Sequence, residues 1–173
     1  MTEPVVLLPE AEVARRVAEM AAALTPRIDD DTIAVCLLTG GLWFAADLTR
    51  ALARLGRHPS FDALWLASYG DERHSGGTVL VRAGFQRPVD GRRVLLMDDV
   101  FDSGLSLRES VRLATEAGAS EVITAVFARK PWPHPRKIEP DFVGWEAPAR
   151  YLVGYGMDAG GRYRGIPDIA SLD

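Results

Sequence analysis

The sequence contains a single cysteine, Cys36, among its 173 residues. One cysteine cannot form an internal disulfide, and a chain of this length can bury a core large enough to fold without one. No apolar run approaches the ~18 residues of a membrane-spanning helix, and the N-terminus lacks the basic start and continuous apolar core of a signal peptide. These absences predict a reducing, cytoplasmic location and no membrane partner.

An excess of basic residues is also missing. Lysine and arginine total 20 against 24 aspartates and glutamates, which gives a formal net charge of -4 at pH 7. Nucleic-acid-binding domains normally show a basic face or stripe. The arginine pairs at 15–16 and 92–93 are too short to make one, and we expect them on solvated surface. The composition therefore predicts no nucleic-acid partner, and without repeats or linkers residues 1–173 are expected to form one domain.

Apolar runs alternate with stretches of helical spacing, which favours an α/β fold with a mostly parallel sheet. Apolar runs of strand length cover residues 32–38, 61–67, 78–81, 94–97, 121–128, 142–145 and 151–155. Helical spacing covers residues 9–24, 42–55 and 105–117. Because strands of a parallel sheet present their carboxyl ends at one edge, we expect the ligand site of this fold at that edge.

The turn after the strand at 94–97 contains more candidate functional residues than any other short segment. Asp98 and Asp99 follow the strand, Asp102 comes three residues later, and residues 103–106 open a helix. A helix N-terminus offers unpaired N–H groups to a phosphate. Adjacent carboxylates can orient vicinal hydroxyls or hold Mg²⁺, and a single loop aspartate can act as an acid or base. The alternative, that Asp102 or Ser103 caps the helix, explains only one of these residues.

Three other segments leave alternatives open. Residues 39–41 end a strand with two glycines, which either bring backbone N–H groups close to a pyrophosphate or simply form a tight turn. The polar segment 68–77 is either a lid or a merely flexible loop. Three prolines exclude regular structure from 129–137, where Lys130 either donates to a ligand oxygen or belongs to a surface connection.

Two further features suggest metal binding at first sight. We interpret the acidic triplet 29–31 as a solvated turn, because consecutive residues of an extended chain point in different directions. We interpret His74 as a surface residue, because it has no metal-binding partner nearby in the sequence.

Together these motifs resemble a type I phosphoribosyltransferase, specifically the hypoxanthine/guanine phosphoribosyltransferase family. Residues 94–106, VLLMDDVFDSGLS, have the form of the family's phosphoribosyl pyrophosphate motif. The purine branch is indicated by LTGG, SYG, Lys130-Pro131, PDFVGWEAPARYLVGYGMD and RYRGIP, in that order. The resemblance implies a mostly parallel sheet flanked by helices, with a small hood formed by terminal segments. It also implies transfer of phosphoribosyl from phosphoribosyl pyrophosphate to N9 of hypoxanthine or guanine.

The resemblance assigns the sugar and phosphate contacts to the stretch 98–106. Asp98 and Asp99 would address the ribose hydroxyls and the Mg²⁺ cofactor, while Asp102 would face purine N7 as general base or acid. The 5′-phosphate would be held by four consecutive residues, Ser103, Gly104, Leu105 and Ser106.

The remaining contacts are assigned to segments on either side of that stretch. Lys130 would donate to the exocyclic oxygen of the purine, Tyr151 would stack on the base, and the backbone of Leu152 would read its edge. Pyrophosphate would be bound by Thr39, Gly40 and Arg164. Asp158 would serve the metal, and Ser68 and Tyr69 would belong to the lid.

The chain departs from the family pattern at two positions. Thr39 stands where the family commonly has a basic residue, and Ala159 stands where an aromatic residue is often found. If this loop works mainly through its backbone N–H groups, often with an unusual peptide geometry in this family, the segment 38–40 can still function with Thr39. Relatives usually form dimers or tetramers, which leads us to expect a homo-oligomer.

Two rival functions remain open from the sequence. One is a regulatory protein that uses the same fold to sense phosphoribosyl pyrophosphate or nucleotide, although no basic surface or winged-helix segment supports it. The other is a transferase for xanthine or another base, because the sequence does not position the donors and acceptors that distinguish purines.

Overall fold

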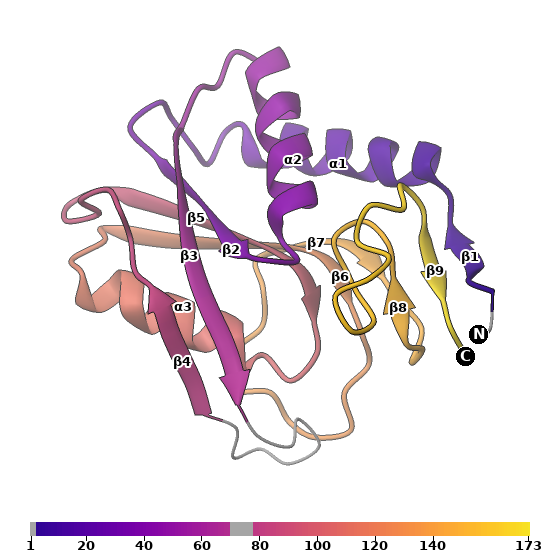
Figure 1. Cartoon of the computed structure of the whole chain (residues 1–173). Helices are drawn as coiled ribbons and strands as arrows, with labels where there is room; N and C mark the ends of the chain where they lie inside the picture. The colour runs from indigo at the N-terminus through magenta and orange to yellow at the C-terminus, as the bar shows by residue number, and fades with distance from the viewer. Residues whose placement is uncertain (1–2, 70–77) are drawn as a thin grey trace.

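The computed structural model describes residues 3–69 and 78–173 (Figure 1). Six strands form the large sheet: β2 (Ile33–Leu38), β3 (Ser60–Tyr69), β4 (Thr78–Ala83), β5 (Arg93–Phe101), β6 (Glu121–Arg129) and β7 (Phe142–Glu146). Their order is β4-β3-β2-β5-β6-β7, and every neighbouring pair is parallel except β3 with β4. The predicted mostly parallel sheet is confirmed.

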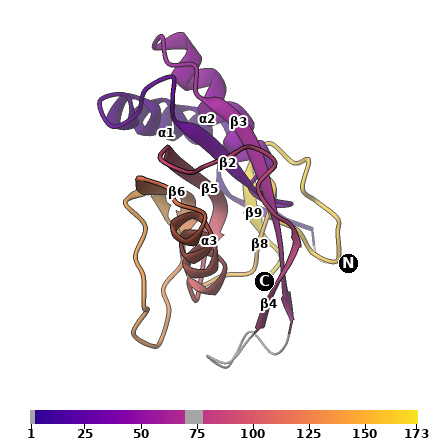
Figure 2. The same ribbon diagram turned by 90° about the vertical axis from the view of Figure 1, so that its left-hand side faces the viewer.

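Three helices cover this sheet: α1 (Glu10–Leu24), α2 (Leu42–Arg54) and α3 (Leu105–Glu116). Helices α1 and α2 lie on one face and α3 lies on the other (Figure 2). Alternate residues of the central strands enter the two cores, so that Met97 packs on the α1/α2 side and Leu96 on the α3 side. Burial on both faces explains why these strands read as unbroken apolar runs.

The two ends of the chain build a second, three-stranded sheet in the order β1-β9-β8; this sheet, together with residue 151 and the connection 154–168, is here called the hood. Its strands are β1 (Val5–Leu8), β8 (Leu152–Val153) and β9 (Ile169–Ser171). Both neighbouring pairs are antiparallel, and β1 lies beside β9 with Val5 opposite Ser171 (Figure 1). The predicted hood of terminal segments is confirmed.

Two long-range contacts fasten the hood to the large sheet and its helices. Asp168 accepts a hydrogen bond of 2.6 Å from the backbone N–H of Glu10 and thus caps α1, whose N-cap residue Pro9 makes no side-chain cap of its own. The Tyr155 hydroxyl donates to Asp47 of α2 at 3.1 Å, and its ring lies 5.0 Å from that of Phe127.

Some predicted boundaries were wrong. The strand predicted at 94–97 continues to Phe101, because Asp98, Val100 and Phe101 remain paired with β6. In the segment 151–155 only Leu152–Val153 is a strand. Ser68 and Tyr69 end β3, where they pair with β4, and residues 70–77, which include His74, lie outside the described residues. Within the described ranges no helix has the length and apolar character needed to span a membrane.

Candidate active site

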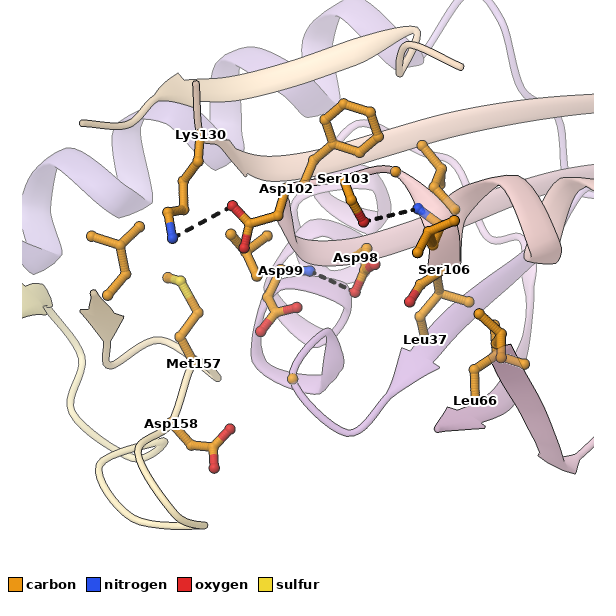
Figure 3. Close-up of a pocket in the computed structure, with 18 of the residues that line it drawn as sticks. Leu37, Leu66, Asp98, Asp99, Asp102, Ser103, Ser106, Lys130, Met157 and Asp158 are labelled. Carbon is orange, nitrogen blue, oxygen red and sulfur yellow. Dashed lines mark hydrogen bonds and ion pairs between the residues drawn. The ribbon is translucent and has the colours of Figure 1, made fainter. Parts of the chain in front are cut away.

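A pocket of about 440 Å³ opens at the carboxyl edge of the large sheet (Figure 3). Its wall combines the end of β2, the end of β5 with the turn into α3, the start of the loop after β6, and the hood. It includes most of the predicted site residues: Gly40, Asp98, Asp99, Asp102, Ser103, Gly104, Leu105, Ser106, Lys130, Tyr151, Leu152, Asp158 and Arg164. Segments up to 124 residues apart in sequence thus meet at the predicted edge.

Asp98 and Asp99 lie in the last part of β5, not in a turn after it. The N–H of Asp99 donates to Asp98 Oδ1 at 3.0 Å. Burial raises the pKa of Asp98 well above its usual range, and the neighbouring Asp99 carboxylate raises it further. Burial also raises the pKa of Asp99, against a lowering by Asp98 and Arg164. Two desolvated carboxylates side by side make a site that favours a bound cation.

The donor set at this position fits Mg²⁺. Mg²⁺ prefers oxygen ligands and is usually held by one or two carboxylates together with substrate phosphates. Within residues 3–69 and 78–173, no group of three or more histidine, cysteine, aspartate or glutamate side chains could hold a metal ion. The pair Asp98 and Asp99 therefore suits a cation that shares its coordination with a substrate.

The turn after β2 packs directly against this carboxylate pair. The Leu38–Thr39 peptide is cis, which confirms the unusual peptide geometry expected of this loop. A Cβ atom on Gly40 would lie 2.0 Å from Asp99 Oδ2, and one on Gly156 would lie 2.0 Å from the carbonyl oxygen of Gly40. Both positions thus require glycine. The Asp99 carboxylate leaves no room for a side chain at Gly40, and the Gly40 carbonyl leaves none at Gly156.

Gly104 provides the N-cap of α3, in a left-handed conformation with φ 81°. No side chain caps this helix, so the alternative interpretation of Asp102 or Ser103 as its N-cap is wrong. Ser103 Oγ only accepts a long hydrogen bond of 3.4 Å from the Leu105 N–H. The first helical bond runs from Arg108 to Gly104, so the N–H groups of the first turn have no acceptor within the helix. This helix start lines the pocket and suits an anion.

Asp102 and Lys130 form an ion pair at the other end of the pocket, with 3.4 Å between Oδ1 and Nζ (Figure 3). Their side chains are 39% and 21% exposed, so both remain accessible to a ligand. They meet because β5 and β6 are parallel neighbours that end at the same edge, where the Lys130 N–H also donates to Phe101 O at 3.0 Å.

The hood supplies the remaining predicted residues. Tyr151 is 53% exposed, and its hydroxyl donates to the carbonyl of Asp158 at 3.2 Å. The Asp158 carboxylate pairs with Arg164 at 2.7 Å and accepts a bond of 2.6 Å from the Gly161 N–H. In Figure 3 Asp158 lies apart from the pair Asp98 and Asp99. Arg164 also donates to Gly156 O at 2.5 Å, next to the loop at Gly40.

Three residues at this site carry no signal in the sequence that points to a role there. Trp132 and Met157 line the pocket, and Arg136 donates to the backbone carbonyls of Asp102 and Lys130. Trp132 and Arg136 lie in the proline-rich segment, where no periodic pattern shows which side chains turn inward. Only the fold of that loop reveals them.

Comparison with known proteins agrees with this geometry. Residues 7–159 match the model of the phosphoribosyl transferase domain family. The chain is 34% identical to the hypoxanthine-guanine phosphoribosyltransferase of Bacillus subtilis, an alignment that covers 96% of this chain and 92% of the relative.

Solved structures give the same result. A hypoxanthine-guanine phosphoribosyltransferase from Bacillus anthracis is 27% identical, with a TM-score of 0.88 and coverage of 100% of both chains. A hypoxanthine phosphoribosyltransferase from Trypanosoma cruzi, in complex with the product IMP, is 25% identical, with a TM-score of 0.88 and coverage of 99% of this chain and 95% of that one. The chain therefore belongs to the type I phosphoribosyltransferases, in the hypoxanthine/guanine phosphoribosyltransferase family.

Proposed function

We propose that the protein transfers the phosphoribosyl group of phosphoribosyl pyrophosphate to N9 of a 6-oxopurine, hypoxanthine or guanine or both, and releases pyrophosphate. One observation carries the proposal. A single pocket combines the adjacent carboxylates of Asp98 and Asp99 and an anion-binding helix start with the ion pair of Asp102 and Lys130. The first two features suit an activated sugar phosphate, and the third suits a base that presents both a proton and a carbonyl oxygen.

In the proposed reaction the N9 lone pair bonds to the anomeric carbon of the ribose. The bond from that carbon to the pyrophosphate oxygen breaks, and pyrophosphate leaves with the electron pair. Asp102 takes the proton from purine N7, while Lys130 donates a hydrogen bond to the exocyclic oxygen. The 3.4 Å separation of these two side chains would allow them to contact neighbouring positions of one purine ring.

Groups at the end of the pocket away from Lys130 would bind the charged phosphates of the sugar and the leaving group. The start of α3, at residues 103–106, would anchor the 5′-phosphate through its N–H groups and helix dipole. Asp98 and Asp99 would hold Mg²⁺ and orient the ribose hydroxyls. Mg²⁺ supplies charge neutralisation for the leaving pyrophosphate when it is bound. Arg164, beside the loop at Gly40, would add a second positive charge there.

The hood would close the purine site from the other side. Tyr151 lines the pocket with an exposed ring, which suits stacking on a planar base. Leu152 follows it in β8 and would read the purine edge through its backbone. Asp158, paired with Arg164, would serve the metal and pyrophosphate together with that arginine.

Two parts of the proposal rest on family membership. Ser68 and Tyr69, at the end of β3, would belong to a lid that excludes water during the reaction. The protein would act as a dimer or tetramer, which light scattering of the purified protein would measure.

Incubation with Mg²⁺, phosphoribosyl pyrophosphate and one purine at a time tests the function. We expect nucleotide and pyrophosphate from hypoxanthine, guanine or both, and little from adenine, which has an amino group where Lys130 needs an acceptor. Preferred use of xanthine would support the rival transferase. Absence of nucleotide from every base, with retained binding of phosphoribosyl pyrophosphate, would support the rival regulatory protein.

A further inference from the structure

Arg136 follows three prolines in the loop between β6 and β7, and its side chain turns back toward the end of β5. That side chain is only 11% exposed. Its guanidinium carbon lies 4.7 Å from the centre of the Phe101 ring, a cation–π contact with a buried aromatic residue. An arginine in such a place is held in one orientation by packing.

The guanidinium bridges two backbone segments that belong to different strands. Nε donates to the carbonyl of Asp102 at 2.7 Å, and Nη2 donates to the carbonyl of Lys130. Nε–H and Nη2–H point the same way from one rigid plane, so they hold two acceptors at a fixed spacing. Lysine lacks this paired, planar arrangement.

The two bridged residues are those whose side chains form the ion pair in the pocket, with 3.4 Å between Lys130 Nζ and Asp102 Oδ1. Both are bridged at their own carbonyl groups, next to the Cα atoms that carry those side chains. The third donor nitrogen, Nη1, reaches Glu139 at 3.4 Å, outside the pocket wall. Arg136 thus acts on the backbone of both residues without lining the pocket itself.

We propose that Arg136 is a positioning residue for the purine, a role that rests on the proposed function. Its guanidinium sets the distance between the Asp102 and Lys130 backbones, so that the carboxylate meets N7 while the ammonium meets the exocyclic oxygen. Within the described residues, the hydrogen bonds, the ion pair and the ring contact of Arg136 involve neither the Asp98 and Asp99 carboxylates nor the glycine loop that would bind the sugar and pyrophosphate. Its loss should therefore impair use of the purine more than use of phosphoribosyl pyrophosphate.

Arg136→Met tests this, because methionine keeps an apolar stem against Phe101 and removes every N–H donor. A displacement of catalytic groups by about 1 Å can cost about 100-fold in rate. We expect kcat to fall and KM for the purine to rise, together lowering kcat/KM for the purine about 10- to 100-fold. KM for phosphoribosyl pyrophosphate should change less than about 3-fold. Arg136→Lys should recover part of the loss.

Arg93→Met is the matched control. Arg93 is also a partly buried arginine with two acceptors, Glu121 and Asp29, but it lies at the opposite end of β5 from Phe101. This variant should keep wild-type kinetics. Equal kinetic losses in both variants, or equal rises of both KM values in Arg136→Met, would overturn the proposal by showing a general structural role.

A double variant separates positioning from stability. If Arg136 acts through the Asp102 and Lys130 pair, Arg136→Met should cost several-fold less in a Lys130→Met background than in the wild type. Equal costs in the two backgrounds would contradict the proposal.

Hydrogen exchange in the ligand-free protein keeps the test independent of catalysis. In Arg136→Met, amides of residues 101–102 and of the segment 129–132 should exchange faster, whereas those of the start of α3, which would bind the 5′-phosphate, and those of α1 should change little. Unchanged exchange in these segments would overturn the proposal that Arg136 fixes the backbones of Asp102 and Lys130. A wild-type protein that makes no nucleotide would refute the proposed function alone, and the exchange experiment would still decide whether Arg136 fixes these segments.

Discussion

At the scale of single residues, burial separates the three carboxylates of residues 98–102. Asp99 is 8% exposed and touches the loop at Gly40, and burial raises the pKa of both Asp98 and Asp99. The side chain of Asp102 is 39% exposed and faces Lys130. A group that exchanges a proton with a ligand needs access to it, which suits Asp102, while the adjacent pair of half-buried Asp98 and buried Asp99 suits a cation.

Replacement of Asp102 by alanine should lower kcat about 10²- to 10⁴-fold, the usual contribution of a positioned acid or base. Because the side chain is partly exposed and does not cap α3, Tm should stay within about 2 °C of the wild type. Steady-state kinetics and a thermal melt measure both quantities. Unchanged turnover would remove Asp102 from the mechanism.

Replacement of Gly40 by alanine should impair binding of phosphoribosyl pyrophosphate, because the new Cβ would lie 2.0 Å from Asp99 Oδ2. Overpacking of this kind typically costs about 1–3 kcal/mol, which corresponds to about 5- to 150-fold in KM if it falls on binding. Gly84→Ala is the control, because a Cβ there has nothing within 4 Å. Similar KM values for the two variants would contradict the steric argument.

Sequence patterns identified most residues of the pocket but missed those that act through distant contacts. The motif at 94–106 and the hood residues Tyr151 and Asp158 were found because they follow a recognisable order. Arg136 and Asp168 were missed, because their partners lie 34 and 158 residues away. The sequence around Arg136 and around Asp168 contains no pattern from which such a distant partner could be predicted.

At the scale of secondary-structure elements, pairing with neighbouring strands sets strand ends that the apolar pattern alone does not predict. The apolar run 94–97 predicted the start of β5 but not its end, because the pairing with β6 carries polar residues inside the strand. Ion pairs join elements at the other end of β5, where Arg93 contacts Glu121 of β6 and Asp29 before β2. The pocket lies at the carboxyl ends of the strands. The Arg93 ion pairs connect β5 to its neighbours at the amino ends.

The Arg93 ion pairs make stability depend on pH. Hydrogen bonds from Arg93 and Arg27 lower the pKa of Glu121, and Thr32 and Arg93 lower that of Asp29. A carboxyl with a lowered native pKa stabilises the fold above its unfolded pKa near 4, and this contribution is lost as pH falls through the native value. Arg93→Met should lower Tm by roughly 1–4 °C at pH 7 and by less at pH 3. An equal drop at both pH values would contradict this.

The cap on α1 comes from the hood, so its removal should affect the helix and the hood together. Asp168→Ala should reduce the free energy of unfolding by about 1 kcal/mol, as is typical for loss of a capping carboxylate. Asp168→Asn keeps an acceptor oxygen and should lose less. Urea unfolding measures both, and equal losses in the two variants would show that the hydrogen bond is not the cause.

At the scale of the whole molecule, residues of the hood and of the large sheet pack in one core cluster. Tyr155 of the hood is 4% exposed and belongs to the same core cluster as Phe44 of α2 and Phe127 of β6. Since the pocket wall is drawn from both parts, any loosening between them would open the pocket on the side of the hood.

Tyr155→Ala should destabilise the protein by about 3–5 kcal/mol, the usual cost of removing a large buried aromatic side chain. Unfolding should still follow a single transition, with fluorescence and circular dichroism giving the same midpoint, because the two sheets share a core. Tyr155→Phe removes only the bond to Asp47 and should cost about 1 kcal/mol. Separate transitions would contradict a shared core.

The order of strands in the hood also has a consequence for biosynthesis. The middle strand, β9, is the last to be made, and the outer strand β1 is the first. The large sheet can assemble as its strands emerge from the ribosome, since domains begin to fold from their N-terminal side during synthesis. The first hood strand must wait for the third, however, so a nascent chain cannot complete the hood until residues 169–171 have left the ribosome.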